Sequence, residues 1–287
     1  MFLSVDIIKI FLDGLSQGAV YALIALGYTM VYGIAKMLNF AHGDIIMVGG
    51  YAIFVGLTML GFWWLGIIFA IVFCIILGIV IERLAYKPLR GASPLAVLIT
   101  AIGVSYLLQS LAQIIMGSAP KMVNIFPSLS RDVKTLITIG VSLLVMAILT
   151  LFVKFSKTGK AMRAVSEDKG AAQLMGINVN RIIAITFAIG SALAGVASFF
   201  YLLKIPQVTP TMGSMPGIKA FTAAVIGGIG SIPGAMLGGF LLGIIENVCN
   251  AIPGLSNFTI AIEFGILIII LMVRPIGILG KARREKV

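Results

Sequence analysis

The sequence predicts an all-α integral membrane protein, a polytopic helical bundle of about eight transmembrane helices (between about seven and ten), some of them broken or half-length. The chain has 287 residues, of which 60% are hydrophobic and only 11% are charged. A soluble domain carries about 25% charged residues, so this composition does not fit one. The mean hydropathy of +1.13 points the same way. No stretch suggests a second domain, and residues 1–287 are expected to form a single transmembrane domain.

Five apolar runs are long enough to cross a membrane as helices. A helix needs about 20 residues to span the hydrocarbon core, and each run approaches or exceeds that length. The runs cover residues 61–81, 94–117, 136–153, 182–203 and 258–273. Glycine is frequent in the chain, with 33 residues, and small residues let membrane helices pack closely. Gly234xxxGly238 and Gly239xxxGly243 have this spacing, so they predict close helix packing, within the chain or against a partner.

Two further apolar regions are interrupted. Residues 14–60 are broken near 36–44, and residues 217–250 are broken near 227–234. Each could be a full hairpin or a pair of half-helices that meet inside the membrane, where protein or water must satisfy the freed backbone groups. Paired interruptions in the two halves of a chain are typical of a transport pathway built from two repeats. We therefore consider a set of candidate pathway residues, namely Asn39, His42, Asp44, Gly227 and Gly228.

Acidic residues at membrane depth are costly and often functional. Asp44, Glu246 and Glu263 are the candidates. Each also has a structural interpretation, since Asp44 could cap the next helix, Glu246 could lie at a polar helix end and Glu263 could lie near a helix start. Asn39 and His42 are the better candidates for lining a polar cavity, because irregular backbone at depth needs one.

The net charge of +11 comes from basic residues whose distribution does not indicate nucleic-acid binding. They gather beside predicted spans, which is the pattern of cytoplasmic loops. This places the C-terminus in the cytoplasm and residues 118–134 outside, in a multi-pass protein surrounded by lipid. The clusters are Arg83, Lys87 and Arg90; Lys154, Lys157, Lys160, Arg163, Lys169 and Arg181; and Arg274, Lys281, Arg283, Arg284 and Lys286.

The longest polar interval, residues 155–181, predicts a short cytoplasmic helix. Ser166 is a good N-cap, and Glu167 and Asp168 would then lie in the first turn, where the helix dipole favours acids. An apolar surface follows, and Gly176 is a natural residue to end the helix. Its apolar side chains would either return to the membrane interface or fit a groove on another protein. They are Ala171, Ala172, Leu174 and Met175.

The sequence contains no motif for catalysis or nucleotide binding. Gly159-Lys160 is followed by Ala161 and lacks the upstream glycine of a phosphate-binding loop. His42 is the single histidine, and no cluster suggests a metal or another cofactor. We therefore expect a non-enzymatic protein whose energy comes from a partner ATPase or from an ion gradient.

Four segments resemble a known family. "GYTMVYG…MLNFAHGD", "GKAMRAVSEDKGAAQLMGINVNRI", "KAFTAAVIGGIGSIPGAMLGG" and "RPIGILG" are similar to the permease subunit of high-affinity branched-chain amino acid ABC importers, of the LivH type rather than the LivM type. The resemblance runs from about Gly14 to Gly280.

The resemblance implies a heteromeric complex in a bacterial plasma (inner) membrane. Its other members would be a LivM-like second permease, two cytoplasmic ATPases and an extracytoplasmic substrate-binding protein. It implies that residues 155–181 form a coupling loop, whose helix from Glu167 to Gly176 seats in the ATPase. Transport of leucine, isoleucine and valine by alternating access would follow, with other amino acids, short amides or urea as alternative substrates. The alternative function is an ion-coupled secondary transporter or channel that acts without an ATPase.

Overall fold

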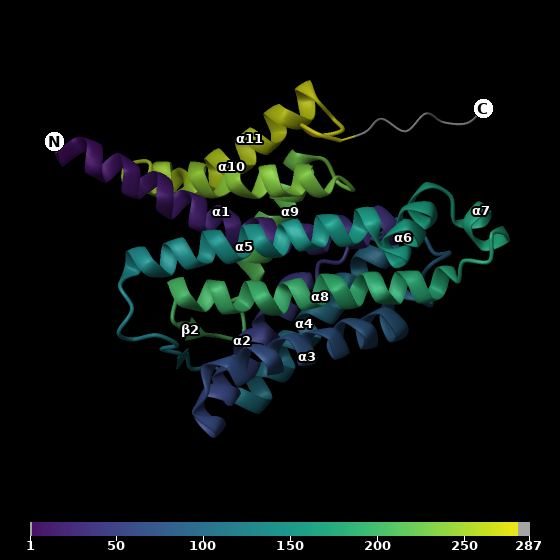
Figure 1. Cartoon of the computed structure of the whole chain (residues 1–287), viewed down its shortest axis with the longest axis horizontal. Coiled ribbons are helices and arrows are strands. Elements are labelled where there is room, and N and C mark those ends of the chain that lie inside the picture. Colours follow the sequence, from purple (N-terminus) through teal and green to yellow (C-terminus); the bar gives the residue numbers. More distant parts are fainter. Residues whose placement is uncertain (1, 281–287) are drawn as a thin grey trace.

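The computed structural model describes residues 2–280, and for residues 2–6 and 60 only the backbone. The basic residues Lys281, Arg283, Arg284 and Lys286 lie outside the described part of the chain. The molecule is a bundle of roughly parallel and antiparallel helices, as Figure 1 shows. Eight of the described helices are long and apolar enough to cross a membrane, as the sequence predicts.

The helices follow the apolar runs with small shifts at their ends. The long ones are α1 (Phe2–Ala35), α2 (His42–Leu60), α3 (Trp63–Ile81), α4 (Pro94–Met116), α5 (Arg131–Phe155), α8 (Val179–Lys204), α10 (Ile232–Ala251) and α11 (Thr259–Val273). Three short helices are α6 (Lys157–Glu167), α7 (Lys169–Leu174) and α9 (Ser214–Gly227). A π-helical turn (Glu82–Tyr86) continues α3, and a 3₁₀ turn (Ser256–Phe258) precedes α11.

The two ends of the bundle differ. One end, here called the strand end, carries a two-stranded antiparallel pairing of β1 (Lys121–Met122) with β2 (Gln207–Val208). This pairing is absent from the sequence prediction, because two-residue strands have no detectable alternation. The other end, here called the loop end, carries α6 and α7, at the right of Figure 1. Lys169 Nζ donates to the carbonyl oxygen of Ala35 at 2.9 Å, so α1 also ends there.

The two interrupted regions resolve differently. In residues 14–60 the break is a short connection from 36 to 41, followed directly by α2. In residues 217–250 the first helix, α9, has only 14 residues and is not among the eight candidate spans. It is the half-length helix that the sequence analysis allows. α2 and α9 begin against each other, since a Cβ atom on Gly43 would lie 2.5 Å from the carbonyl oxygen of Gly213.

The helix contacts repeat in two halves of the chain. α1 packs on α10 as α8 packs on α3, α2 packs on α3 as α9 packs on α10, and α2 contacts α4 as α9 contacts α11. α1 and α8 run in opposite directions between the two ends of the bundle. The helices α8–α11 therefore repeat the contacts of α1–α4 but run in the opposite direction through the bundle. Such an inverted repeat is the organisation of many transport proteins.

Close glycine contacts hold these halves together. Gly239 and Gly243 of α10 pack on Ala22 and Gly18 of α1, while Gly238 packs on α9. The two GxxxG motifs of α10 are thus both used inside this chain. This confirms the predicted close packing and shows that it occurs within the chain rather than against a partner.

Candidate functional site

The loop between α5 and α8 forms two helices instead of the single predicted one. Ser156 caps α6, because its side chain accepts a hydrogen bond from the Gly159 amide at 2.9 Å. Met162 and Val165 are buried on one face of α6 and fix it to the loop end of the bundle. The loop is therefore a packed structure rather than a linker.

The predicted N-cap of the second helix is wrong by two residues. Ser166 and Glu167 end α6, and the Ser166 hydroxyl donates to the carbonyl oxygen of Arg163 at 2.7 Å. Asp168 caps α7 instead, since its Oδ1 accepts from the amides of Gly170 at 2.8 Å and Ala171 at 3.0 Å. Both residue types are good N-caps, so the capping preference alone does not choose between them.

The end of α7 agrees with the prediction. Gly176 has φ +80°, a left-handed conformation that glycine adopts readily, and its amide donates to the carbonyl oxygen of Gln173 at 3.0 Å. The amide of Ile177 donates to Ala172 at 3.0 Å. α7 is thus closed at both ends by hydrogen bonds.

One face of α7 is buried and the other carries exposed apolar side chains. Ala172 packs inward, whereas Ala171 is exposed. Leu174 is 91% exposed and Met175 is 82% exposed. Lys169 anchors the helix to Ala35, and burial, followed by the neighbouring Arg90, lowers its pKa below the ordinary value for lysine. A short, rigid helix therefore presents two large apolar side chains away from the bundle.

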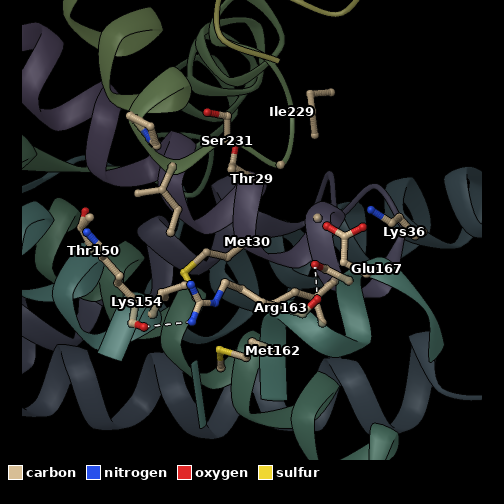
Figure 2. Close-up of a pocket in the computed structure, with 17 residues that line it drawn as sticks. Thr29, Met30, Lys36, Thr150, Lys154, Met162, Arg163, Glu167, Ile229 and Ser231 are labelled. Carbon is tan, nitrogen blue, oxygen red and sulfur yellow. Dashed lines mark hydrogen bonds between the residues drawn. The ribbon is translucent and has the colours of Figure 1, made fainter. Parts of the chain in front are cut away.

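A cavity of about 430 Å³ opens beside this loop, and Figure 2 shows its lining. α1 contributes Thr29 and Met30, α5 contributes Lys154, and α6 contributes Arg163 and Glu167. The opposite wall is the connection between α9 and α10, with Ile229 and Ser231. Arg163 Nη2 donates to the carbonyl oxygen of Lys154 at 2.9 Å. The cavity places the loop next to the break in the second half of the chain.

The candidate pathway residues of the first break are buried in protein. Asn39 Oδ1 accepts from the Tyr86 hydroxyl at 2.9 Å, and Asp44 Oδ1 accepts from Gln109 Nε2 at 2.9 Å. His42 packs edge-on against Tyr28, with ring centroids 4.8 Å apart. Asn39 lies beside a cavity of about 10 Å³, and the cavities of about 430 Å³ and 600 Å³ are lined by other residues. Their role in a pathway stays a prediction.

The candidate glycines of the second break serve its backbone. Gly228 has φ +104°, and a Cβ atom there would lie 2.6 Å from Cα of Gly280. Gly227 ends α9 against the first turn of α10, near Gly234. The terminal RPIGILG segment closes over this turn, because the amides of Ile278 and Leu279 donate to the carbonyl oxygens of Ile226 and Gly227 at 2.9 Å.

Sequence reasoning misses Lys219, which the structure brings together with both acids of the last spans. Lys219 Nζ lies 2.8 Å from Glu246 Oε1 and 3.2 Å from Glu263 Oε1. The signal for it was a lysine within an apolar half-helix, since ionisable groups at membrane depth need partners. The two acids are therefore members of one ion-pair cluster with Lys219.

Comparisons with known proteins agree on the family. Residues 10–272 match the family model described as "Branched-chain amino acid transport system / permease component". The chain is 44% identical to the high-affinity branched-chain amino acid transport system permease protein BraD of Pseudomonas aeruginosa, and 43% identical to LivH of Escherichia coli strain K12, with 96% of each chain covered in both cases.

A solved structure shares the fold at low sequence identity. It is PsaBC from Streptococcus pneumoniae in complex with Fab, with a TM-score of 0.51 and 16% identity over 92% of this chain and 91% of that chain. With the sequence matches over nearly its whole length, the chain therefore belongs to the family of branched-chain amino acid transport permeases, the membrane components of ABC transporters.

Proposed function

We propose that this permease forms half of the transmembrane pathway of an importer that carries leucine, isoleucine and valine into a bacterial cell. The names of its relatives at 43–44% identity support this substrate class. In this transporter family the ATPase activity lies in separate subunits. The family assignment also removes the basis for the alternative of an ion-coupled transporter or channel that acts alone.

The single observation that carries the coupling proposal is the exposed apolar pair on α7. Leu174 and Met175 are 91% and 82% exposed on a helix that is capped at both ends and anchored by Lys169. Exposed apolar pairs on a fixed amphipathic helix suit insertion into a hydrophobic groove. We assign this groove to the ATPase subunit, with α7 as the docking helix. Ser166, Glu167 and Asp168 lie directly before α7 in the sequence. ATP binding then moves this helix and rocks the spans, as a rigid-body transition of an interface.

The orientation follows from the charges gathered at the loop end. Arg90 hydrogen-bonds Asn180 and pairs with Glu82, which places the first two basic clusters together at that end. By the positive-inside rule the loop end is cytoplasmic. The chain then begins outside, because Asp13 of α1 pairs with Arg131 at the start of α5, at 2.7 Å, and the C-terminus is cytoplasmic.

A second permease subunit covers α4 and α11. These are the least buried of the eight candidate spans. The exposed face of α4 carries Gly103, Tyr106, Ser110 and Gln113 at helical spacing, and polar groups at membrane depth usually face protein or a water-filled path rather than lipid. The substrate path lies at this face, between a LivH-type and a LivM-type subunit, and an extracytoplasmic binding protein delivers the amino acid at the strand end.

The coupling proposal is tested by the double change Leu174→Asp and Met175→Asp. It should abolish both copurification of the ATPase and ATP-driven uptake of labelled leucine, because two charges replace the apolar contact. Gln173→Asp is the matched control, since Gln173 is exposed on the same helix and its change removes no apolar contact. If copurification and uptake both survive the double change, the docking proposal is wrong.

Substrate class is tested by uptake into liposomes that hold the full complex. Labelled leucine, isoleucine and valine should be transported at the expense of ATP, while urea and short amides should not. Transport of an amide in place of the three amino acids would contradict the proposed substrate and leave the ATP-coupled mechanism intact.

A further inference from the structure

The half-length helix α9 is attached to α11 and its following segment at two points. Near the middle of α9, Lys219 Nζ lies 3.2 Å from Glu263 Oε1 of α11. At its end, the carbonyl oxygens of Ile226 and Gly227 accept hydrogen bonds from the amides of Ile278 and Leu279, both at 2.9 Å. Two attachments about two helical turns apart fix both the position and the rotation of a 14-residue helix.

The Lys219 contact is buried. Lys219 is 8% exposed and Glu263 is 0% exposed. Removing one partner of a buried ion pair leaves an uncompensated charge, which is strongly unfavourable. Separating the lysine from its acid is therefore costly.

Glu246 of α10 completes the cluster but has a different set of partners. Its Oε1 lies 2.8 Å from Lys219 Nζ, and its Oε2 accepts from the Tyr21 hydroxyl of α1 at 2.7 Å. Glu263 has no such second contact, since its Oε2 has no hydrogen-bond partner among the described residues. Within the described part of the chain, Lys219 is thus the one ion-pair partner of Glu263. Loss of Glu246 would weaken the α9–α10 contact and leave the contact from α9 to α11.

α9 also leads directly to the coupling loop. The residues that follow it, Ile229 and Ser231, form one wall of the cavity whose other wall includes Arg163 and Glu167 of α6, as Figure 2 shows. A displacement of α6 and α7 therefore acts on α8, which contacts both helices, and reaches the end of α9 across this cavity.

We propose that Lys219 is a positioning residue that locks α9 to α11, so that the two helices move as one body when the coupling loop is displaced. Without the lock, α9 can follow the loop while α11, which faces the second subunit, stays behind. ATP is then hydrolysed with less transport. The inference rests on the proposed function, because it needs an ATP-driven cycle.

The test measures labelled leucine transported per ATP hydrolysed, in liposomes that contain the complete complex with its ATPases and binding protein. Lys219→Met and Glu263→Gln should each lower this ratio about tenfold while complex assembly is retained, the size of effect seen when a coupling contact is lost. Lys219→Arg, which keeps charge and reach, should restore most of the ratio. Glu246→Gln should change it less than about twofold, because the α9–α11 contact remains.

A matched control and a double variant separate positioning from folding. Lys9→Met, at an exposed lysine of α1, should leave the ratio unchanged. The double variant Lys219→Met with Glu263→Gln should be no worse than Lys219→Met alone, because that change already removes the contact to Glu263. A merely structural role would reduce the amount of assembled complex and leave the ratio per assembled complex as in the wild type.

Two results would overturn the proposal. One is a ratio within about twofold of the wild type in both single variants. The other is failure of both single variants and the double variant to assemble, which assigns the contact to folding. If only Lys219→Met fails to assemble, the ratio of leucine transported to ATP hydrolysed in Glu263→Gln decides whether the proposal holds. If the wild-type complex shows no ATP-driven uptake, the proposed function has failed instead.

Discussion

Asp168 shows where residue preferences predict the site and where they do not. Ser166 and Asp168 both suit an N-cap, and the preference for each is similar. The choice is made by packing, because Met162 and Val165 of α6 are buried and extend the first helix through Glu167. Gly176, by contrast, is predictable, because few residues other than glycine adopt its left-handed conformation readily.

The cap gives a prediction for a single residue. Asp168→Ala should destabilise α7 by about 1 kcal/mol, because the amides of Gly170 and Ala171 lose their acceptor. Faster hydrogen exchange at these two amides measures the effect. Asp168→Asn keeps an acceptor and should lie close to the wild type, and so should Ser166→Ala, whose hydroxyl donates to the carbonyl oxygen of Arg163 in α6. Equal exchange in Asp168→Ala and the wild type would show that the cap does not hold α7.

At the scale of helices, apolar runs predict the membrane spans well, because a run of about 20 apolar residues has the length and composition of a transmembrane helix. Which spans contact one another is harder to predict from the sequence. Lys219, Glu246 and Glu263 come from three helices, and no spacing within one helix relates them. The point at which α9 begins depends on Gly43 and Gly213 meeting in the bundle, which is a contact between distant parts of the chain.

The contact of α1 with α10 gives a prediction for an element. A Cβ atom on Gly243 would lie 2.6 Å from the carbonyl oxygen of Gly14, so Gly243→Ala should push the two helices apart at a cost of about 2 kcal/mol. Thermal unfolding of the purified complex measures this loss. Gly140→Ala of α5 is the control, since no atom lies within 4 Å of its added Cβ. Equal unfolding temperatures for the two variants would contradict the close packing.

At the scale of the whole molecule, the two inverted halves and the loop between them suggest how energy enters. α5, α6 and α7 stand between the halves in sequence, and the cavity joins α6 to the break of the second half. The paired interruptions predict two repeats, but they lie between α1 and α2 and between α9 and α10, which are not equivalent positions of the two halves. The cavity was not predictable, because it is lined by three stretches far apart in the chain, residues 29–36, 150–167 and 229–233.

The proposed subunit interface gives a prediction for the assembly. A photo-crosslinking amino acid in place of Ser110 on α4 should form an adduct with the second permease, since Ser110 lies on the exposed polar face. The same group in place of Ile76, an exposed apolar residue of α3, should label lipid. An adduct to the second permease from position 76 and none from position 110 would place the interface elsewhere.

The central claim is that this permease transports amino acids only when partner ATPases drive it. The direct measurement is leucine uptake by liposomes that contain the complete complex, with ATP inside and ion gradients dissipated, compared with liposomes that contain the two permeases alone under an imposed ion gradient. We expect uptake in the first case, its loss when Leu174 and Met175 are changed to Asp, and none in the second case. Uptake by the permeases alone that follows the ion gradient would contradict the account.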